Sequence, residues 1–151
     1  MSETLAYPIG LQDFRTLREE GYVYIDKTRY IATLIKNKAR YCFLARPRRF
    51  GKSLFLSTLQ CFFEGRRDLF KGLAIDSMDW DWMQYPVLRL DLNSHSYMEQ
   101  GRLDSVLDNT FRNWERKYGV DVKDDDYSQR FRTIIKTAHE KTGKPVVILV
   151  D

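Results

Sequence analysis

The first forty residues carry hydrophobic positions in a pattern that predicts a helix, a short strand and a second helix. Apolar side chains recur at helical spacing around Phe14, and the aromatic, β-branched stretch 22–25 has the composition of a strand. A second helical pattern follows, with Asp26 or Thr28 as its capping residue. We interpret residues 1–40 as an N-terminal lead-in segment.

After residue 40 the pattern changes to a regular alternation of strands and helices. Hydrophobic runs of strand length occupy 41–45 and 146–150, and a strand pattern with partial alternation occupies 87–92. Helical periodicity occurs in the segments between them, beginning near residues 51, 103 and 131. Because strands that alternate with helices form parallel sheets covered on both faces, the expected fold class is α/β with a mostly parallel sheet.

A polar loop joins the first of these strands to its helix and contains a glycine–lysine–serine sequence. The general phosphate-binding pattern is a glycine, any four residues, and then Gly-Lys-Ser or Gly-Lys-Thr. Gly51, Lys52 and Ser53 supply its second half, whereas Arg46 stands where the first glycine is expected. In such loops the lysine contacts the β- and γ-phosphates and the hydroxyl binds Mg²⁺. The alternative interpretation is an ordinary strand–loop–helix turn with a capping serine.

The predicted phosphate-binding set extends to both sides of this sequence, and no catalytic residue is predicted. The set comprises Arg48, Arg49, Phe50, Gly51, Lys52, Ser53 and Leu54. Arginine side chains in the loop present planar heads with several donors, which suit phosphate or an acidic partner. Salt bridges to neighbouring carboxylates are the alternative use of the arginines, and the sequence leaves both open.

The last apolar run, 146–150, is followed by Asp151. A buried strand that ends in aspartate matches the Walker B pattern, whose carboxylate binds Mg²⁺. Ligands of parallel sheets bind beyond the carboxyl ends of the strands, where both the loop and Asp151 are expected. The predicted Mg²⁺ ligands are therefore Ser53 and Asp151, although Asp151 is also the last residue and can be read as a solvated chain end.

Three segments resemble the AAA-ATPase-like family of bacteria and archaea. They are Pro8-Ile9-Gly10 with Asp13-Phe14 and Leu17-Arg18, then Tyr24-Ile25-Asp26-Lys27-Thr28, and the loop Arg46-Pro47-Arg48-Arg49-Phe50-Gly51-Lys52-Ser53. In that family an Arg-Pro-Arg-Arg-Phe-Gly-Lys loop replaces the glycine-led one, so Arg46 agrees with the family pattern. The resemblance implies ATP and Mg²⁺ as ligands and a P-loop NTPase-like three-layer sandwich, incomplete at the C-terminus.

Members of that family are usually longer, with a glutamate after the Walker B aspartate, further ATPase core and often a C-terminal nuclease domain. The resemblance therefore implies that residues 41–151 are the N-terminal part of an ATPase core that ends at Walker B. The expected function is an ATP-binding module that is truncated and deficient in hydrolysis as given. The alternative is a non-catalytic protein-interaction domain that keeps the P-loop fold, in which Lys52 is only a surface charge. Strand edges at 41–45 and 146–150, left without partners, would favour self-association.

Composition limits the other partners. No hydrophobic run approaches the roughly 20 residues of a membrane helix, so no membrane partner is expected. The net charge of +4 mildly favours an anionic partner. Nucleic-acid binding through this chain alone is not expected, because basic residues are not interleaved with exposed aromatic ones. Cys42 and Cys61 lack metal or disulfide spacing and are predicted to be reduced core residues of a cytoplasmic protein.

Overall fold

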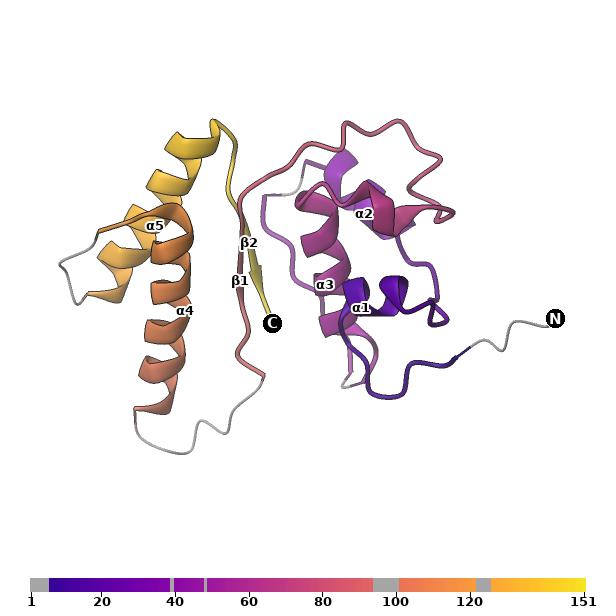
Figure 1. Ribbon diagram of the computed structural model, residues 1–151, viewed down its shortest axis with the longest axis horizontal. Helices are drawn as coiled ribbons and strands as arrows, with labels where there is room; N and C mark the ends of the chain where they lie inside the picture. The colour runs from indigo at the N-terminus through magenta and orange to yellow at the C-terminus, as the bar shows by residue number, and fades with distance from the viewer. Residues whose placement is uncertain (1–5, 39, 48, 94–100, 122–125) are drawn as a thin grey trace. The chain divides into compact units, whose positions relative to one another are not determined.

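A computed structural model of the protein describes residues 6–38, 40–47, 49–93, 101–121 and 126–151 (Figure 1). The chain forms two compact units, the first ending at Gln84 and the second spanning Tyr85–Asp151. The predicted division into a lead-in segment and an ATPase core after residue 40 stays a prediction.

Three α-helices among the described residues of the first unit occur where the sequence predicts them. They are α1 (Phe14–Glu19), α2 (Arg29–Lys36) and α3 (Lys52–Phe63), followed by the 3₁₀ helix η1 (Arg67–Phe70). Asp13 caps α1 by accepting a hydrogen bond of 2.8 Å from the Thr16 N–H. The strand predicted at 22–25 is reduced to a single parallel bridge between Ala6 and Tyr22.

An aromatic core holds α1 and η1 against α3. Phe14 of α1 is fully buried, with ring centroids 5.0 Å from Tyr24 and 4.9 Å from Phe70. Phe62 of α3 joins the same cluster through Trp82, at 5.1 Å between ring centroids. Helix α1 is too short to be stable alone, so this burial is what stabilises it.

The strand predicted at 41–45 is wrong. The segment belongs to no strand in the part of the chain that the structure describes. Its side chains are exposed, with Tyr41 at 96% and Phe43 at 93%, and Cys42 is exposed rather than in the core. A strand exists only where a neighbouring strand accepts and donates its backbone hydrogen bonds, and an apolar run alone cannot supply that neighbour. Cys61 is buried, as predicted.

The second unit contains a parallel sheet of two strands among the described residues, β1 (Val87–Leu90) and β2 (Val147–Val150). Val87 lies opposite Val147, and Leu90 lies opposite Val150. Helices α4 (Arg102–Tyr118) and α5 (Tyr127–Thr142) connect the strands, so the parallel order is confirmed. β1 is shorter than predicted because only four of its residues pair with β2. The three-layer P-loop sandwich stays a prediction.

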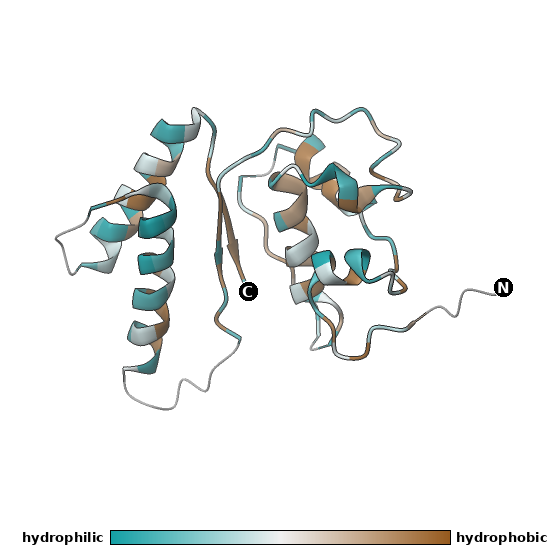
Figure 2. Cartoon of the chain, in the orientation of Figure 1, coloured by the Kyte–Doolittle hydropathy of each residue, from teal (hydrophilic) through white to brown (hydrophobic). Residues whose placement is uncertain are grey.

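One face of this sheet packs on the two connecting helices. The buried cluster consists of Leu88, Phe111, Trp114, Tyr118, Ile134 and Ala138. Figure 2 shows hydrophobic colour along β2 and hydrophilic colour along much of α4, as expected for an amphipathic helix that covers a sheet. Within the described residues, no helix combines the length and the hydrophobicity needed to span a membrane.

An ion cluster joins α4 to α5 beside this core. The guanidinium of Arg130 donates to both carboxylate oxygens of Glu115, at 2.7 and 3.0 Å, and to Asp108 at 2.7 Å. Arg130 is only 7% exposed and also lies over the rings of Phe111 and Tyr127. The paired carboxylates hold its charge in an otherwise apolar contact between helices.

The first unit should lose stability in acid through Asp26. Burial by itself raises the pKa of Asp26, but hydrogen bonds from the Ala74 N–H and from Thr28, with the charge of Arg29, hold it below its usual value of 3.8. A carboxylate with a lowered pKa stabilises the fold above its unfolded pKa, and this contribution is lost as the pH falls through the folded value.

We therefore expect Asp26→Asn to reduce the stability of the first unit at pH 7. The difference in unfolding free energy from wild type should disappear as the pH falls below 3.8 and through the lowered pKa of Asp26. Urea unfolding followed at several pH values measures this difference. Asp79→Asn is the matched control, because Asp79 is exposed and forms no ion pair among the described residues. If the difference in unfolding free energy between wild type and Asp26→Asn is constant across the pH range, Asp26 acts through its shape rather than its charge.

Candidate phosphate-binding loop

The loop before α3 turns sharply at two residues. Arg49 has φ 64° and Gly51 has φ 73°, both in the left-handed region. Gly51 tolerates this conformation because it has no Cβ atom, and it is the N-cap residue of α3. The Gly51 carbonyl accepts a hydrogen bond of 3.0 Å from the Phe55 N–H. The first turn of α3 therefore directs its backbone N–H groups and the positive end of the helix dipole toward the loop.

Lys52 bends back over the loop. Its ammonium group donates a hydrogen bond of 3.0 Å to the carbonyl of Arg46, the residue at the position of the first glycine in the general pattern. The two ends of the loop are thereby joined by the side chain that phosphate-binding loops use to hold the β- and γ-phosphates. A carbonyl is a neutral acceptor, and a phosphate oxygen is a stronger, charged one.

The other predicted site residues of this region surround the same turn. Phe50 is exposed, and Ser53 and Leu54 lie in the first turn of α3 with partly buried side chains. The Leu54 carbonyl accepts a hydrogen bond of 2.8 Å from the Thr58 hydroxyl. Arg48 lies outside the described residues.

The described basic groups at the loop lack acidic partners among the residues that the structure describes. Arg46, Arg49 and Lys52 form no ion pair with a carboxylate in the described part of the chain. Salt bridging was the alternative interpretation of the loop arginines, and for Arg46 and Arg49 the described residues provide none. Uncompensated positive charge of this kind attracts an anion.

Sequence reasoning did not include Lys27 in the site. A Cβ atom built on Gly51 would lie 3.9 Å from the Lys27 Nζ atom, so this ammonium group lies beside the backbone where the loop meets α3. Lys27 belongs to the segment Tyr24-Ile25-Asp26-Lys27-Thr28, which resembles the family pattern. The residue types of that segment do not indicate that Lys27 lies near Gly51.

The other N-terminal segment of the family pattern anchors α3. The Ser57 hydroxyl accepts a hydrogen bond of 2.9 Å from the Phe14 N–H and donates one of 3.1 Å to Asp13. Burial by itself raises the pKa of Asp13, but hydrogen bonds from Thr16 and Ser57 outweigh it and lower the pKa. Asp13 is therefore a charged anchor for the helix that carries Lys52.

Asp151 lies in the second unit, directly after β2. Its N–H donates to the Leu90 carbonyl at 2.9 Å, and its carbonyl accepts from the Leu92 N–H at 3.0 Å, so the parallel pairing continues past the strand. Its carboxylate forms an ion pair of 3.2 Å with Arg89 of β1. Ser53 and Asp151 belong to different units, so their joint role as Mg²⁺ ligands stays a prediction.

The sequence profile described as "Predicted AAA-ATPase", of the AAA-ATPase-like family, matches residues 8–151. The chain belongs to this family. It is 39% identical over 146 residues to a protein of Azotobacter chroococcum mcd 1 described as "Uncharacterized protein in vnfD 5'region". The alignment covers 95% of this chain and 28% of that relative, so the chain spans little more than a quarter of the relative's length. No solved structure matches the chain.

Membership of the AAA-ATPase-like family confirms the resemblance at the level of the family.

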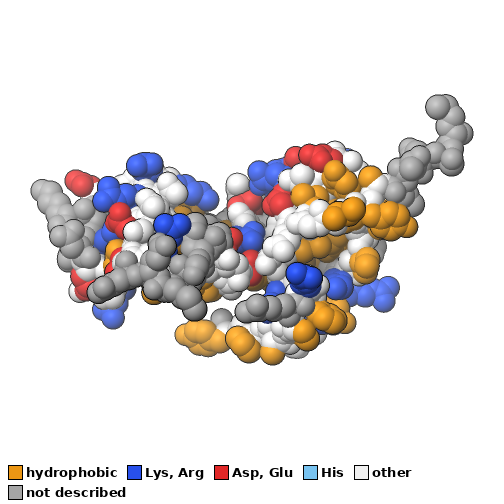
Figure 3. Space-filling model, turned by 90° about the horizontal axis from the view of Figure 1, so that it is seen from below, with side chains coloured by type: hydrophobic (Ala, Val, Ile, Leu, Met, Phe, Trp, Pro, Cys, Tyr) orange, Lys and Arg blue, Asp and Glu red, His pale blue; other side chains and the backbone are white. Residues whose placement is uncertain are grey.

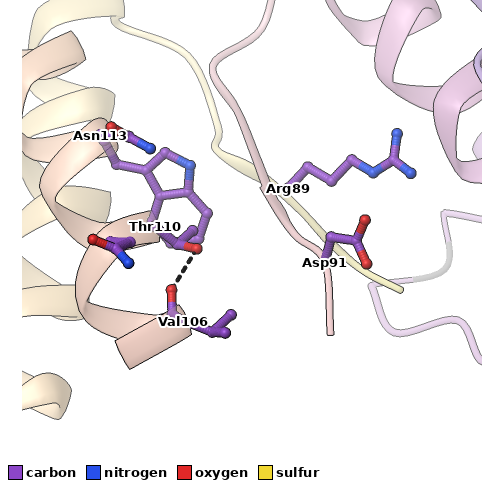
Figure 4. A pocket seen from close by; sticks show the side chains of 7 residues that line it. Arg89, Asp91, Val106, Thr110 and Asn113 are labelled. Atoms are coloured by element: carbon purple, nitrogen blue, oxygen red, sulfur yellow. Dashed lines mark hydrogen bonds between the residues drawn. The ribbon is translucent and has the colours of Figure 1, made fainter. Parts of the chain in front are cut away.

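The second unit of this family member has a hollow of about 360 Å³ between β1 and α4 (Figure 4). Val106, Thr110 and Asn113 reach it from α4, and Arg89 and Asp91 extend from the β1 segment. The lining is mostly polar and open, and none of the predicted site residues contributes to it.

Proposed function

We propose that this chain is the ATP-binding module of an AAA-ATPase-like protein, with the loop 46–53 holding the phosphates. The observation that carries the proposal is the position of Lys52, whose ammonium closes the loop on the Arg46 carbonyl and has no carboxylate partner among the described residues. Family membership supports ATP as the nucleotide.

On binding, Lys52 exchanges the Arg46 carbonyl for phosphate oxygens, which accept a charge-assisted and therefore stronger hydrogen bond. The N–H groups of the first turn of α3 bind the same phosphates, and Gly51 allows their close approach because it has no side chain. We further propose that Arg48, Arg49, Phe50 and Leu54 line the bound phosphates.

We propose Ser53 and Asp151 as the residues that hold Mg²⁺ with the nucleotide. A hydroxyl and a carboxylate are oxygen donors of the type that Mg²⁺ prefers, so the donor set fits the ion. Mg²⁺ is usually bound through one or two protein ligands together with substrate phosphates and water. Bound Mg²⁺ would neutralise charge on the β- and γ-phosphates.

The test is isothermal titration calorimetry with MgATP on wild type and Lys52→Ala. Loss of a charge-assisted contact should weaken binding by about 1.5–3 kcal/mol, a factor of roughly 10 to 150 in Kd. Lys71→Ala is the matched control, since Lys71 is exposed and lies in the same unit. Equal affinities of wild type and Lys52→Ala would refute the assignment.

A protein-interaction function is the second candidate, favoured by exposed apolar side chains on the first unit. Ile9 is 97% exposed, and Tyr41 and Phe43 are almost fully exposed. Figure 3 shows hydrophobic side chains forming part of the surface beside Lys and Arg side chains. If calorimetry detects no MgATP binding to wild type and the purified chain self-associates, this candidate replaces the first.

A further inference from the structure

We propose that Lys27 is a second phosphate-binding lysine of the loop, so that ammonium groups from two separate segments hold the nucleotide. This inference rests on the proposed function and extends its binding site to the lead-in segment. Lys27 precedes α2, whereas Lys52 begins α3. Neither the general phosphate-binding pattern nor the loop sequence includes it.

The Lys27 ammonium lies beside the backbone of the loop. Nζ lies 3.9 Å from the point where a Cβ atom of residue 51 would be, and residue 51 is the glycine at which the loop becomes α3. In phosphate-binding loops the phosphates approach the backbone at this glycine. A lysine beside it is therefore within reach of the same phosphate oxygens.

The backbone on both sides of Lys27 is also anchored. Asp26 accepts a hydrogen bond of 2.7 Å from the Ala74 N–H, and the fully buried Thr28 hydroxyl accepts one of 3.1 Å from the Ile75 N–H. Thr28 occupies the N-cap position of α2 without capping it, because its hydroxyl bonds Ile75 and Asp26 instead. A side chain on an anchored backbone loses less conformational entropy when it binds a ligand.

No carboxylate in the described part of the chain forms an ion pair with Lys27. Its ammonium forms no ion pair and no hydrogen bond there. The neighbouring carboxylate of Asp26 is engaged by the Ala74 N–H and by Thr28. Lys27 and Lys52 thus bring like charges to one short loop, and their repulsion is relieved when a polyanion binds. The triphosphate of a nucleotide has the required charge.

The experiment compares Lys27→Ala, Lys27→Arg and the control Lys36→Ala in calorimetric titrations with MgATP. Lys36 is an exposed lysine in the last turn of α2. We expect Lys27→Ala to weaken MgATP binding about tenfold, Lys27→Arg to keep most of the affinity, and Lys36→Ala to match wild type. The deficit of Lys27→Ala should shrink at high salt, because a charge interaction with an accessible ligand is screened.

The outcomes separate this inference from the proposed function. If Lys52→Ala loses affinity while Lys27→Ala behaves like Lys36→Ala, the inference fails and the proposed function stands. If Lys27→Arg is as weak as Lys27→Ala, shape rather than charge is responsible and the inference also fails. Absence of MgATP binding to wild type overturns both. Thermal unfolding checks each variant, and Lys27→Gln replaces Lys27→Ala if the alanine variant does not fold.

Discussion

Truncation of Phe14 to alanine is expected to lower the free energy of unfolding of the first unit by about 3–5 kcal/mol. Phe14 has no exposed surface, and its ring contacts those of Tyr24 and Phe70. Removing it leaves a cavity between α1, η1 and the segment around Tyr24, which short helices cannot close without losing other contacts. Hydrogen exchange of peptides from α3, detected by mass spectrometry, measures the change in the free energy of unfolding of the first unit.

Ile9→Ala is the matched control for Phe14→Ala. Ile9 is almost fully exposed in the same unit, so its truncation should change stability by less than about 0.5 kcal/mol. If Phe14→Ala changes the free energy of unfolding measured by exchange of α3 by less than about 1 kcal/mol, α1 does not stabilise α3, the helix that carries Lys52. MgATP affinity of Phe14→Ala should fall with the population of folded first unit.

The second large effect is expected in the second unit, where Arg130→Ala should cost about 3 kcal/mol of unfolding free energy. The change leaves Glu115 without its paired donors and removes the guanidinium from the rings of Phe111 and Tyr127. The expected cost is at the lower end for a buried ion pair because Asp108 is partly accessible to water.

Arg132→Ala is the control on the same helix, since Arg132 is exposed and forms no ion pair among the described residues. Trp114 packs in the core beside Phe111. When Trp80 and Trp82 are replaced by phenylalanine, the fluorescence of Trp114 during urea unfolding measures the stability of the second unit. Equal midpoints for the two arginine variants would show that the ion cluster contributes no net stability.

Helices were predictable from the sequence to a greater extent than strands. Periodicity identified α1, α4 and α5, because a helix satisfies its hydrogen bonds within one segment. The run 41–45 has strand-like residues, yet Tyr41 and Phe43 are exposed and no strand forms there in the described structure. Strand formation depends on a partner elsewhere in the chain, and a local pattern does not contain that information.

Some residues of the candidate site could likewise be predicted from the sequence, and others could not. Gly51 and Lys52 were identifiable because a short motif carries their chemistry. Lys27 was not, since its proximity to Gly51 depends on how Asp26 and Thr28 bond to a distant segment. The ion pair between Arg89 and Asp151 likewise follows from strand pairing, which the sequence does not specify residue by residue.

The hydrogen bonds among Asp13, Phe14 and Ser57 restrict how this sequence can drift during evolution. Replacing Ser57 by alanine would leave the buried Phe14 N–H without its acceptor and would remove the hydrogen bond from Ser57 to the Oδ2 atom of Asp13. Such losses are costly in a protein interior, whereas threonine keeps the hydroxyl. In descendants of this sequence, position 57 should therefore retain a hydroxyl for as long as position 13 retains its carboxylate, even though the two positions lie on opposite sides of the loop 46–53 in the sequence.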